Sequence, residues 1–378
     1  MYNVGLRLER DMGELAVTTI VGLGGFAVGL VFGATAQRTN FCTMGAISDA
    51  VLMGDRRRLR AWLLAIAVAI IGTHALHVSG AIDINKSIYL APNLGWLGAV
   101  VGGLMFGFGM TLTGGCGSKT LVRLGGGNLK SLVVAMVLGL VAYMTLRGLL
   151  ALVRVWIESA ANIDLKARGL GNQNIGEMAA AWLGLPGHSG RVAAAVVIAA
   201  ALLAFCAKDE AFRRSAVNIV GGLLIGLTAV AGWVVTGILG ADEFEPAPLA
   251  SITFVAPMGE SLQYLMTFTG ATINFGIAAV GGVIAGSFLM AVATGAFRVE
   301  TFTDRSDFVR HLAGAALMGA GGVLALGCTI GQGVTGMSTL ALGSVIAWLS
   351  ILTGGILGVK YLEEGSLGGA VRAVLARG

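Results

Sequence analysis

The sequence predicts an all-α polytopic membrane protein, with about nine transmembrane helices, broken or re-entrant helices among them, and an inverted-topology internal repeat. Hydrophobic residues make up 56% of the 378 residues and charged residues only 12%, whereas a soluble domain carries about 25% charged residues. Mean hydropathy is +0.84. Two glycine-rich motifs, at 113–118 and 325–333, each contain a cysteine and follow an apolar run. Such sequence suits a regular membrane helix poorly, so breaks are expected there.

Nine apolar segments are long enough to cross a hydrocarbon core of about 30 Å. The first contains Ala34-Thr35-Ala36, which resembles a signal-peptide cleavage site. Its apolar run is long for a signal peptide, and acidic residues mix with basic ones before it, so we expect a retained first span. The nine segments are 15–36, 61–79, 95–112, 131–157, 191–207, 216–240, 273–294, 311–327 and 341–361.

The connectors between these segments predict an orientation. The strongest basic cluster, Asp55-Arg56-Arg57-Arg58-Leu59-Arg60, is expected in the cytoplasm, because short cytoplasmic loops carry an excess of Lys and Arg. Alternating from this cluster places the N-terminus outside and the C-terminus in the cytoplasm. Connector 163–190 is then an exposed external loop, and connector 249–272 a short helix that lies at the interface or dips into the membrane.

Two stretches of four segments each resemble one another, and the single segment 191–207 separates them. An odd separator reverses the second stretch, which is the plan of an inverted-topology repeat. The second stretch reaches Trp233 where the first has Cys42, so the similarity breaks at Cys42. The predicted organisation is a first repeat half at 15–157, an external loop and connecting helix at 158–215, an inverted second half at 216–361 and a cytoplasmic tail at 362–378.

Three cysteines lie in related polar contexts: Cys42 in Asn40-Phe41-Cys42-Thr43, Cys116 in Gly114-Gly115-Cys116-Gly117-Ser118, and Cys328 in Gly327-Cys328-Thr329-Ile330-Gly331. Breaks of this kind leave backbone N–H groups at the ends of half-helices, where partial positive charge binds anions. A thiol adds a weak donor and a polarisable sulfur. Because no Asp or Glu lies within the motifs, the pattern favours a soft, sulfur-containing anion over a hard cation.

The candidate substrate-binding residues are these thiols and their neighbours. A buried cysteine often only packs, and Cys206, in an apolar run, is assigned to packing. Charge within a membrane is costly and usually functional, although Arg38 and Lys119 have the alternative of reaching the cytoplasmic surface; Arg123 is assigned to a loop. The full set is Cys42, Cys116, Cys328, Gly115, Gly117, Ser118, Asn40, Gly327, Gln332, Gly331, Arg38 and Lys119.

Several functions are not expected. The net charge of +5 comes without a basic face interleaved with aromatic residues, so nucleic acid is not an expected partner. The cysteines form no CxxC pair, and His74 and His77 are assigned to a helix end rather than to metal. No P-loop occurs, and no His or Asp close to the motif cysteines would activate a thiolate. We therefore expect no enzyme, no cofactor and no metal, in a protein surrounded by lipid.

The three motifs resemble those of the YeeE/YedE sulfur-transport family, over roughly 18–157 and 216–361. Lys119 and the residues after it suggest a branch similar to SoxT proteins. The resemblance implies a bacterial inner-membrane protein that takes up thiosulfate along a relay of Cys42, Cys116 and Cys328, without covalent change and with Cys116 first from the periplasm. It also implies a small sulfur-carrier or rhodanese-like partner in the cytoplasm. Thr329-Ile330 stand where many members carry a proline, which leaves other sulfur or selenium species open as substrates.

A membrane sensor that binds a sulfur anion and signals to a regulator is the alternative function. A dianion that enters an inside-negative cell works against about 4.6 kcal/mol at 100 mV. No acidic residue within the predicted spans suggests a proton relay. We therefore expect a channel-like path that is drawn forward by consumption inside the cell.

Overall fold

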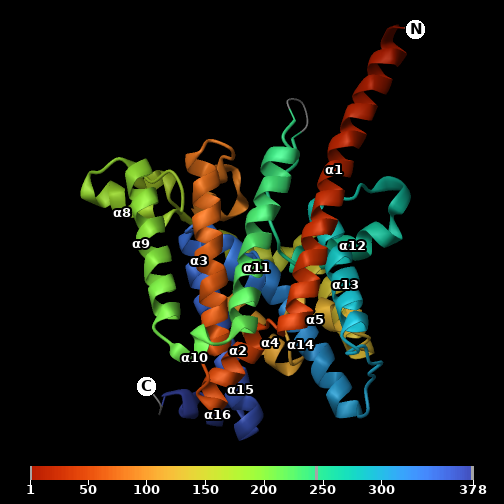
Figure 1. Ribbon diagram of the computed structural model, residues 1–378, viewed down its shortest axis with the longest axis vertical. Helices are drawn as coiled ribbons and strands as arrows, with labels where there is room; N and C mark the ends of the chain where they lie inside the picture. Colours follow the sequence, from red (N-terminus) through yellow and green to blue (C-terminus); the bar gives the residue numbers. More distant parts are fainter. Residues whose placement is uncertain (1, 243–245, 376–378) are drawn as a thin grey trace.

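The computed structural model describes residues 2–242 and 246–375, most of which are helical (Figure 1). Eight helices in this part of the chain are long and apolar enough to cross a membrane, which confirms an all-α polytopic membrane protein. The candidate spans are Val17–Met53, Arg57–Val78, Trp96–Gly125, Leu129–Arg147, Gly187–Ala207, Ala216–Leu239, Phe275–Ala293 and Leu342–Glu364.

All nine predicted segments are helical, with two differences of detail. Helix α14 (Arg305–Leu324) is not among the eight candidate spans, and its first turns carry several charged residues. The segment predicted at 131–157 is two helices, because α6 (Leu129–Arg147) ends at Gly148 and α7 (Ala151–Ala161) follows. The predicted first span belongs to one continuous helix, α1 (Tyr2–Thr39).

The remaining elements are mostly short and connect these helices. Within the described residues the only paired strands are β1 (Asn93–Leu94) and β2 (Ile163–Asp164), which are antiparallel. The other α-helices are α2 (Thr43–Ser48), α3 (Arg57–Val78), α4 (Trp96–Leu112), α5 (Gly117–Gly125), α8 (Ile175–Leu183), α9 (Gly187–Ala207), α10 (Glu210–Arg213), α11 (Ala216–Val234), α12 (Val255–Met266), α13 (Phe275–Ala293), α15 (Leu342–Glu364) and α16 (Leu367–Leu375). Tighter or wider turns are η1 (Asp49–Met53), η2 (Ile84–Lys86), η3 (Ile88–Leu90), η4 (Lys166–Arg168), η5 (Val235–Leu239), η6 (Phe268–Gly270) and η7 (Gly331–Gly336).

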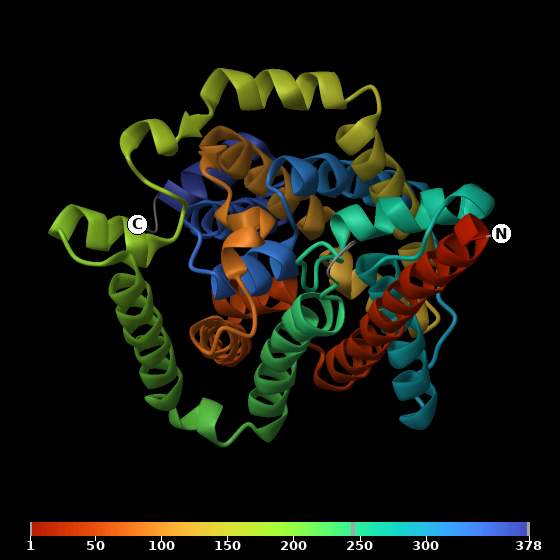
Figure 2. The same cartoon turned by 90° about the horizontal axis from the view of Figure 1, so that it is seen from above.

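The helix pairings of the two predicted halves correspond. Helix α1 packs against α13 as α11 packs against α3, and α4 packs against α15 as α14 packs against α6. Helix α4 also packs directly against α14, its counterpart in the other half. Figure 2 shows α9 at the periphery, where it packs against α3. The pattern is the one expected of an internal repeat, which stays a prediction together with its boundaries.

Glycine lets the paired helices approach closely. In the pair α1 and α13, a Cβ on Gly29 or Gly33 would overlap the backbone of Ala279 or Val283. The same holds in reverse for Gly282 and Gly286 of α13, where a Cβ would overlap the backbone of Phe26 or Leu30. Small residues drive helix association in membranes, where no hydrophobic effect separates helix from lipid. This packing fixes α1, whose C-terminal end leads into Cys42.

Two connectors differ from simple surface loops. Connector 163–190 is mostly exposed or half-buried, but Asn174 within it is fully buried and donates from Nδ2 to the Thr339 carbonyl at 2.9 Å. Arg191, at the start of α9, pairs with Glu177 and donates to Asn85 Oδ1 at 2.6 Å. A polar loop can therefore be buried when its amides cap other backbone groups. In connector 249–272, α12 begins with a buried first turn, as expected of a segment that dips inward.

Candidate functional site

Three breaks in the helices position the three motif cysteines. The break after α1 contains Asn40 with φ 52, the break after α4 contains Gly114 with φ 68, and the break after α14 contains Leu326 with φ 55. Left-handed backbone is costly for most residues with a Cβ, although Asn adopts it more readily, so Leu326 holds the more strained position. Each break reverses or ends one helix and begins another.

Each motif cysteine stands at the start of the next helix. Cys42 is the N-cap of α2, Cys116 is the N-cap of α5, and Cys328 directly precedes the helical residues 329–338. All three side chains are buried. Unpaired backbone N–H groups and the helix dipole make such positions attractive to anions, which is the local structure that the glycine-rich motifs predict.

The thiols converge although they come from distant parts of the chain. Cys116 Sγ lies 3.2 Å from Ser118 Oγ, and it is also within hydrogen-bonding reach of Cys42 and close to Thr329. The backbone N–H of Gly331 donates to Cys328 Sγ at 3.4 Å. Cys328 lies within electrostatic range of Cys116. Three sulfur atoms and the polar groups beside them therefore form one buried cluster.

Three buried polar groups beside these cysteines make no hydrogen bond of normal geometry: Thr43 Oγ1, Thr329 Oγ1 and Gln332 Oε1. Each follows a motif cysteine by one to four residues, and each residue is no more than 3% exposed. An unsatisfied buried group costs about 1–3 kcal/mol, so each of these groups calls for a partner such as an ordered water or a ligand. Gln332 is held in place by its Nε2, which donates to the Ala325 carbonyl at 2.5 Å.

Lys119 connects the cluster to a neighbouring cavity. Its ammonium donates to Asn40 Oδ1 at 2.5 Å, and it lies within electrostatic range of Cys42 and Cys116. The residue is only 8% exposed, so the alternative that it extends to the surface is wrong. Lys119 also lines a cavity of about 680 Å³.

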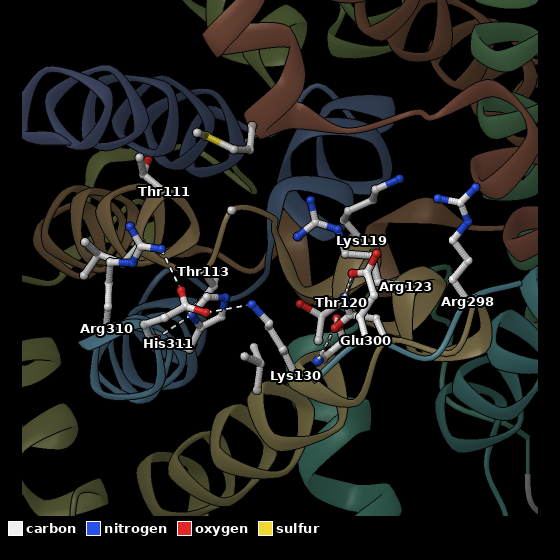
Figure 3. A pocket seen from close by; sticks show the side chains of 18 of the residues that line it. Thr111, Thr113, Lys119, Thr120, Arg123, Lys130, Arg298, Glu300, Arg310 and His311 are labelled. Carbon is white, nitrogen blue, oxygen red and sulfur yellow. Dashed lines mark hydrogen bonds and ion pairs between the residues drawn. The ribbon is translucent and has the colours of Figure 1, made fainter. Parts of the chain in front are cut away.

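This cavity lies among the connectors that the charge bias assigns to the cytoplasm (Figure 3). Its wall includes residues from the breaks, Thr113 and Gly114, as well as Gln37 at the end of α1. On the opposite side of the cluster, Tyr89 and Thr253 approach Gly331. Both residues belong to connectors that are predicted to lie outside. The thiols thus lie between a basic cavity on one side and connectors that are predicted to lie outside on the other.

Comparison with known proteins decides the family. A family model described as sulphur transport matches residues 38–357. The chain belongs to the sulphur transport family.

Similar curated proteins are named as transporters. The chain is 29% identical to the thiosulfate transporter TsuA of Escherichia coli over 331 residues, which cover 82% of this chain and 86% of that protein. It is 27% identical to the thiosulfate transporter TsuA of Spirochaeta thermophila, over 87% of this chain and 96% of that protein. A shorter match, 31% identical over 123 residues, joins it to the probable transporter YedE of Escherichia coli, covering 32% of this chain and 27% of that protein. The family and these relatives are transporters rather than enzymes.

The structure of this sulphur transport protein brings most of the predicted site residues together. Gly115, Gly117, Ser118, Gly327 and Gly331 are buried in or beside the breaks. Asn40 contributes its side-chain oxygen to Lys119 although the residue itself is exposed. Arg38 is separate, because it is exposed at the end of α1 and no hydrogen bond or ion pair of its side chain is found within the described residues. Membership in this family leaves the role of each residue as a prediction.

Two features of the site escape sequence reasoning in this sulphur transport protein. Arg123, assigned to a loop, lies in the last turn of α5, and it lines the cavity. A further helix start lies at α12, where the N-cap residue Phe254 packs on Phe32 with ring centroids 5.1 Å apart. The only hint in the sequence is spacing. Arg123 follows Lys119 by four residues and Cys116 by seven, which places all three on one side of a helix.

Proposed function

We propose that this protein moves thiosulfate, or a closely related sulfur anion, across the bacterial inner membrane along Cys42, Cys116 and Cys328. The observation that carries the proposal is the buried cluster of three thiols with unsatisfied hydroxyl and amide groups, in a family of sulphur transporters. Thiosulfate transport is the function named for two relatives that match most of the chain.

The chemistry of the cluster suits a soft dianion. Three helix starts supply backbone N–H groups and partial positive charge, the hydroxyls of Thr43 and Thr329 supply donors, and the thiols supply polarisable contacts. The motifs contain no Asp or Glu that would repel an anion. Because each contact is a hydrogen bond or a dispersion contact, the anion passes without covalent change. Such weak, repeated contacts allow entry and release.

The order of encounter follows from the sides of the cluster. The resemblance implies that Cys116 meets the substrate first. The basic cavity, however, lies beside the Cys116 motif and among connectors assigned to the cytoplasm, whereas Tyr89 of an outer connector lies near the Cys328 motif. This geometry favours Cys328 as the outer thiol and Cys116 and Cys42 as the inner ones, for an N-terminus outside and a C-terminus in the cytoplasm.

The two repeat halves, 15–157 and 216–361, form the path in this proposal. The matching helix pairings support an inverted repeat, with 158–215 as a peripheral addition. The tail of the predicted 362–378 contains α16, and its last three residues lie outside the described part. A small cytoplasmic sulfur-carrier or rhodanese-like protein would receive the anion at the cavity mouth.

Uptake of radiolabelled thiosulfate into proteoliposomes tests the proposal. We expect saturable uptake by the wild type and at least about a tenfold loss in Cys116→Ala, because a contact to a charged substrate is worth about 1.5–3 kcal/mol. Cys206→Ala is the matched control, since Cys206 is buried elsewhere and donates to the Arg60 carbonyl at 3.3 Å. Equal uptake by all three proteins would make the thiols packing residues. Thiosulfate binding without flux in any of them would favour a sensor.

A further inference from the structure

The cavity beside the thiols carries an excess of positive charge. Five cationic side chains and two carboxylates line it, which leaves three positive charges with His311 neutral. The cations come from α5, from the start of α6, from the connector between α13 and α14, and from the start of α14. They are Lys119, Arg123, Lys130, Arg298 and Arg310, and the carboxylates are Glu300 and Asp307.

The two carboxylates are already engaged. Asp307 accepts from Lys130 at 2.7 Å and from Arg310 at 2.7 Å, and Figure 3 shows these contacts as one linked group. Glu300 accepts from the neutral Asn128 Nδ2 at 2.6 Å and keeps its negative charge. Among the described residues, no ion pair joins a carboxylate to the other three cations, Lys119, Arg123 and Arg298.

These three cations lie on the side of the cavity away from the Asp307 group (Figure 3). Lys119 and Arg123 are close enough to repel one another. The Arg123 guanidinium lies against the break before Cys116, with Nη1 3.4 Å from where a Cβ on Gly115 would stand. Like charges that are held close together and form no ion pair repel one another, and an anion bound between them lowers that cost.

Arg298 is brought to the cavity by a backbone strap, residues 296–300. Its N–H donates to the Gly126 carbonyl at 3.1 Å, and the N–H of Leu129 donates to the Glu300 carbonyl at 2.8 Å. Gly127 lies against this strap with φ 98. The strap therefore fixes the backbone of an arginine whose side chain is exposed, opposite the α5 helix that carries Lys119 and Arg123.

We propose that Lys119, Arg123 and Arg298 form a second anion-binding site, which holds one small divalent oxyanion of the sulfate or thiosulfate class on the C-terminal side of the thiols. The proposal rests on the proposed function and deepens it. It adds a binding step on the C-terminal side of the thiol cluster, where sulfate would compete with thiosulfate. Guanidinium groups suit tetrahedral oxyanions because they donate in pairs. The predicted repeat does not reproduce this site, since the residues three and seven after Cys328 are the neutral Gly331 and Thr335.

Binding of radiolabelled sulfate to the purified protein in nanodiscs of neutral lipid, at fixed ionic strength, tests the site. We expect about one sulfate per protein, and affinity lower by about tenfold in Arg123→Gln and in Arg298→Gln, as for the loss of one charge-assisted hydrogen bond. Arg213→Gln is the matched control, because Arg213 is exposed on α10 and does not line the cavity. Its affinity should equal that of the wild type. Thermal melting of each variant verifies folding.

Transport separates this inference from the proposed function. We expect sulfate to inhibit thiosulfate flux when it is added on the side of the C-terminus, and both arginine variants to relieve the inhibition. Thiosulfate flux in the wild type without sulfate binding would overturn the site and leave the function intact. Sulfate binding that is equal in the wild type and both arginine variants would also overturn it. Sulfate binding that depends on both arginines, without thiosulfate flux, would support the site and overturn the proposed function.

Discussion

Thr329 offers the sharpest test of the buried cluster, because a structural role and a substrate-binding role predict opposite effects of Thr329→Val. The Thr329 hydroxyl is fully buried beside Cys116 and makes no hydrogen bond of normal geometry. Leaving such a group unpaired costs about 1–3 kcal/mol. Valine has nearly the same shape without the hydroxyl, so we expect the free protein to be as stable as the wild type, or more stable by up to that amount.

The same substitution should weaken substrate binding. A hydroxyl that donates to a dianion is worth about 1.5–3 kcal/mol, so the KM for thiosulfate should rise by roughly 10–150-fold. The assay combines thermal unfolding, with and without thiosulfate, and the concentration dependence of uptake. In the wild type thiosulfate should raise the melting temperature, and in Thr329→Val it should do so only at much higher concentration.

Thr228→Val is the control for this experiment. Thr228 is buried and does not line the cavity, and its hydroxyl donates to the Ile225 carbonyl at 2.7 Å, so its bonding is satisfied within the protein. We expect a loss of about 0.5–1.5 kcal/mol in stability and an unchanged KM. The reasoning is refuted if Thr329→Val behaves in the same way, with lower stability and normal KM, because the hydroxyl would then be a structural donor.

Two further predictions concern the wall of the basic cavity. The Lys130 ammonium, followed by Arg310, lowers the pKa of Asp307 from its usual 3.8 to about 2. This carboxylate therefore contributes stability that is complete above about pH 4 and lost as pH falls toward about 2. The difference in melting temperature between wild type and Asp307→Asn should shrink over that range, and a constant difference would contradict the ion pair as its cause. Gly127→Ala should weaken sulfate binding, since its Cβ would stand 2.6 Å from the Arg298 carbonyl at φ 98. Gly184→Ala is the control, because it carries a similar backbone strain of about 1–2 kcal/mol but its Cβ would meet nothing within 4 Å. Equal sulfate affinity in the two variants would show that the strap does not position the anion site.

The sequence was sufficient for the local structure of the site. Glycine and cysteine in a polar motif after an apolar run predicted a helix break, and the breaks at Gly114 and Leu326 lie where the motifs are. Helix starts at Cys42 and Cys116 follow from the same pattern. Local reasoning works here because a left-handed residue and an N-cap depend on a few neighbours.

Contacts between the halves could not be predicted in this way. That Thr329 lies beside Cys116 depends on how α4 packs against α14, over more than 200 residues of separation, and no periodicity records it. Arg123 was assigned to a loop because α5 is short and polar compared with a membrane span. Arg298 becomes part of the cavity only through backbone hydrogen bonds to Gly126, which a sequence pattern does not reveal.

The basic cavity lies beside the Cys116 motif and has no counterpart after Cys328, and this uneven charge bears on the direction of transport. Affinity for an anion on one side cannot alter the equilibrium distribution across the membrane, so the basic cavity cannot itself drive a dianion against about 4.6 kcal/mol at 100 mV. It can raise occupancy beside the thiols, but a site that binds too tightly would slow release. Asp307 limits the excess, because it neutralises part of the charge of Lys130 and Arg310. The arrangement therefore fits a path in which the cavity sets the rate of release and consumption of the anion sets its direction.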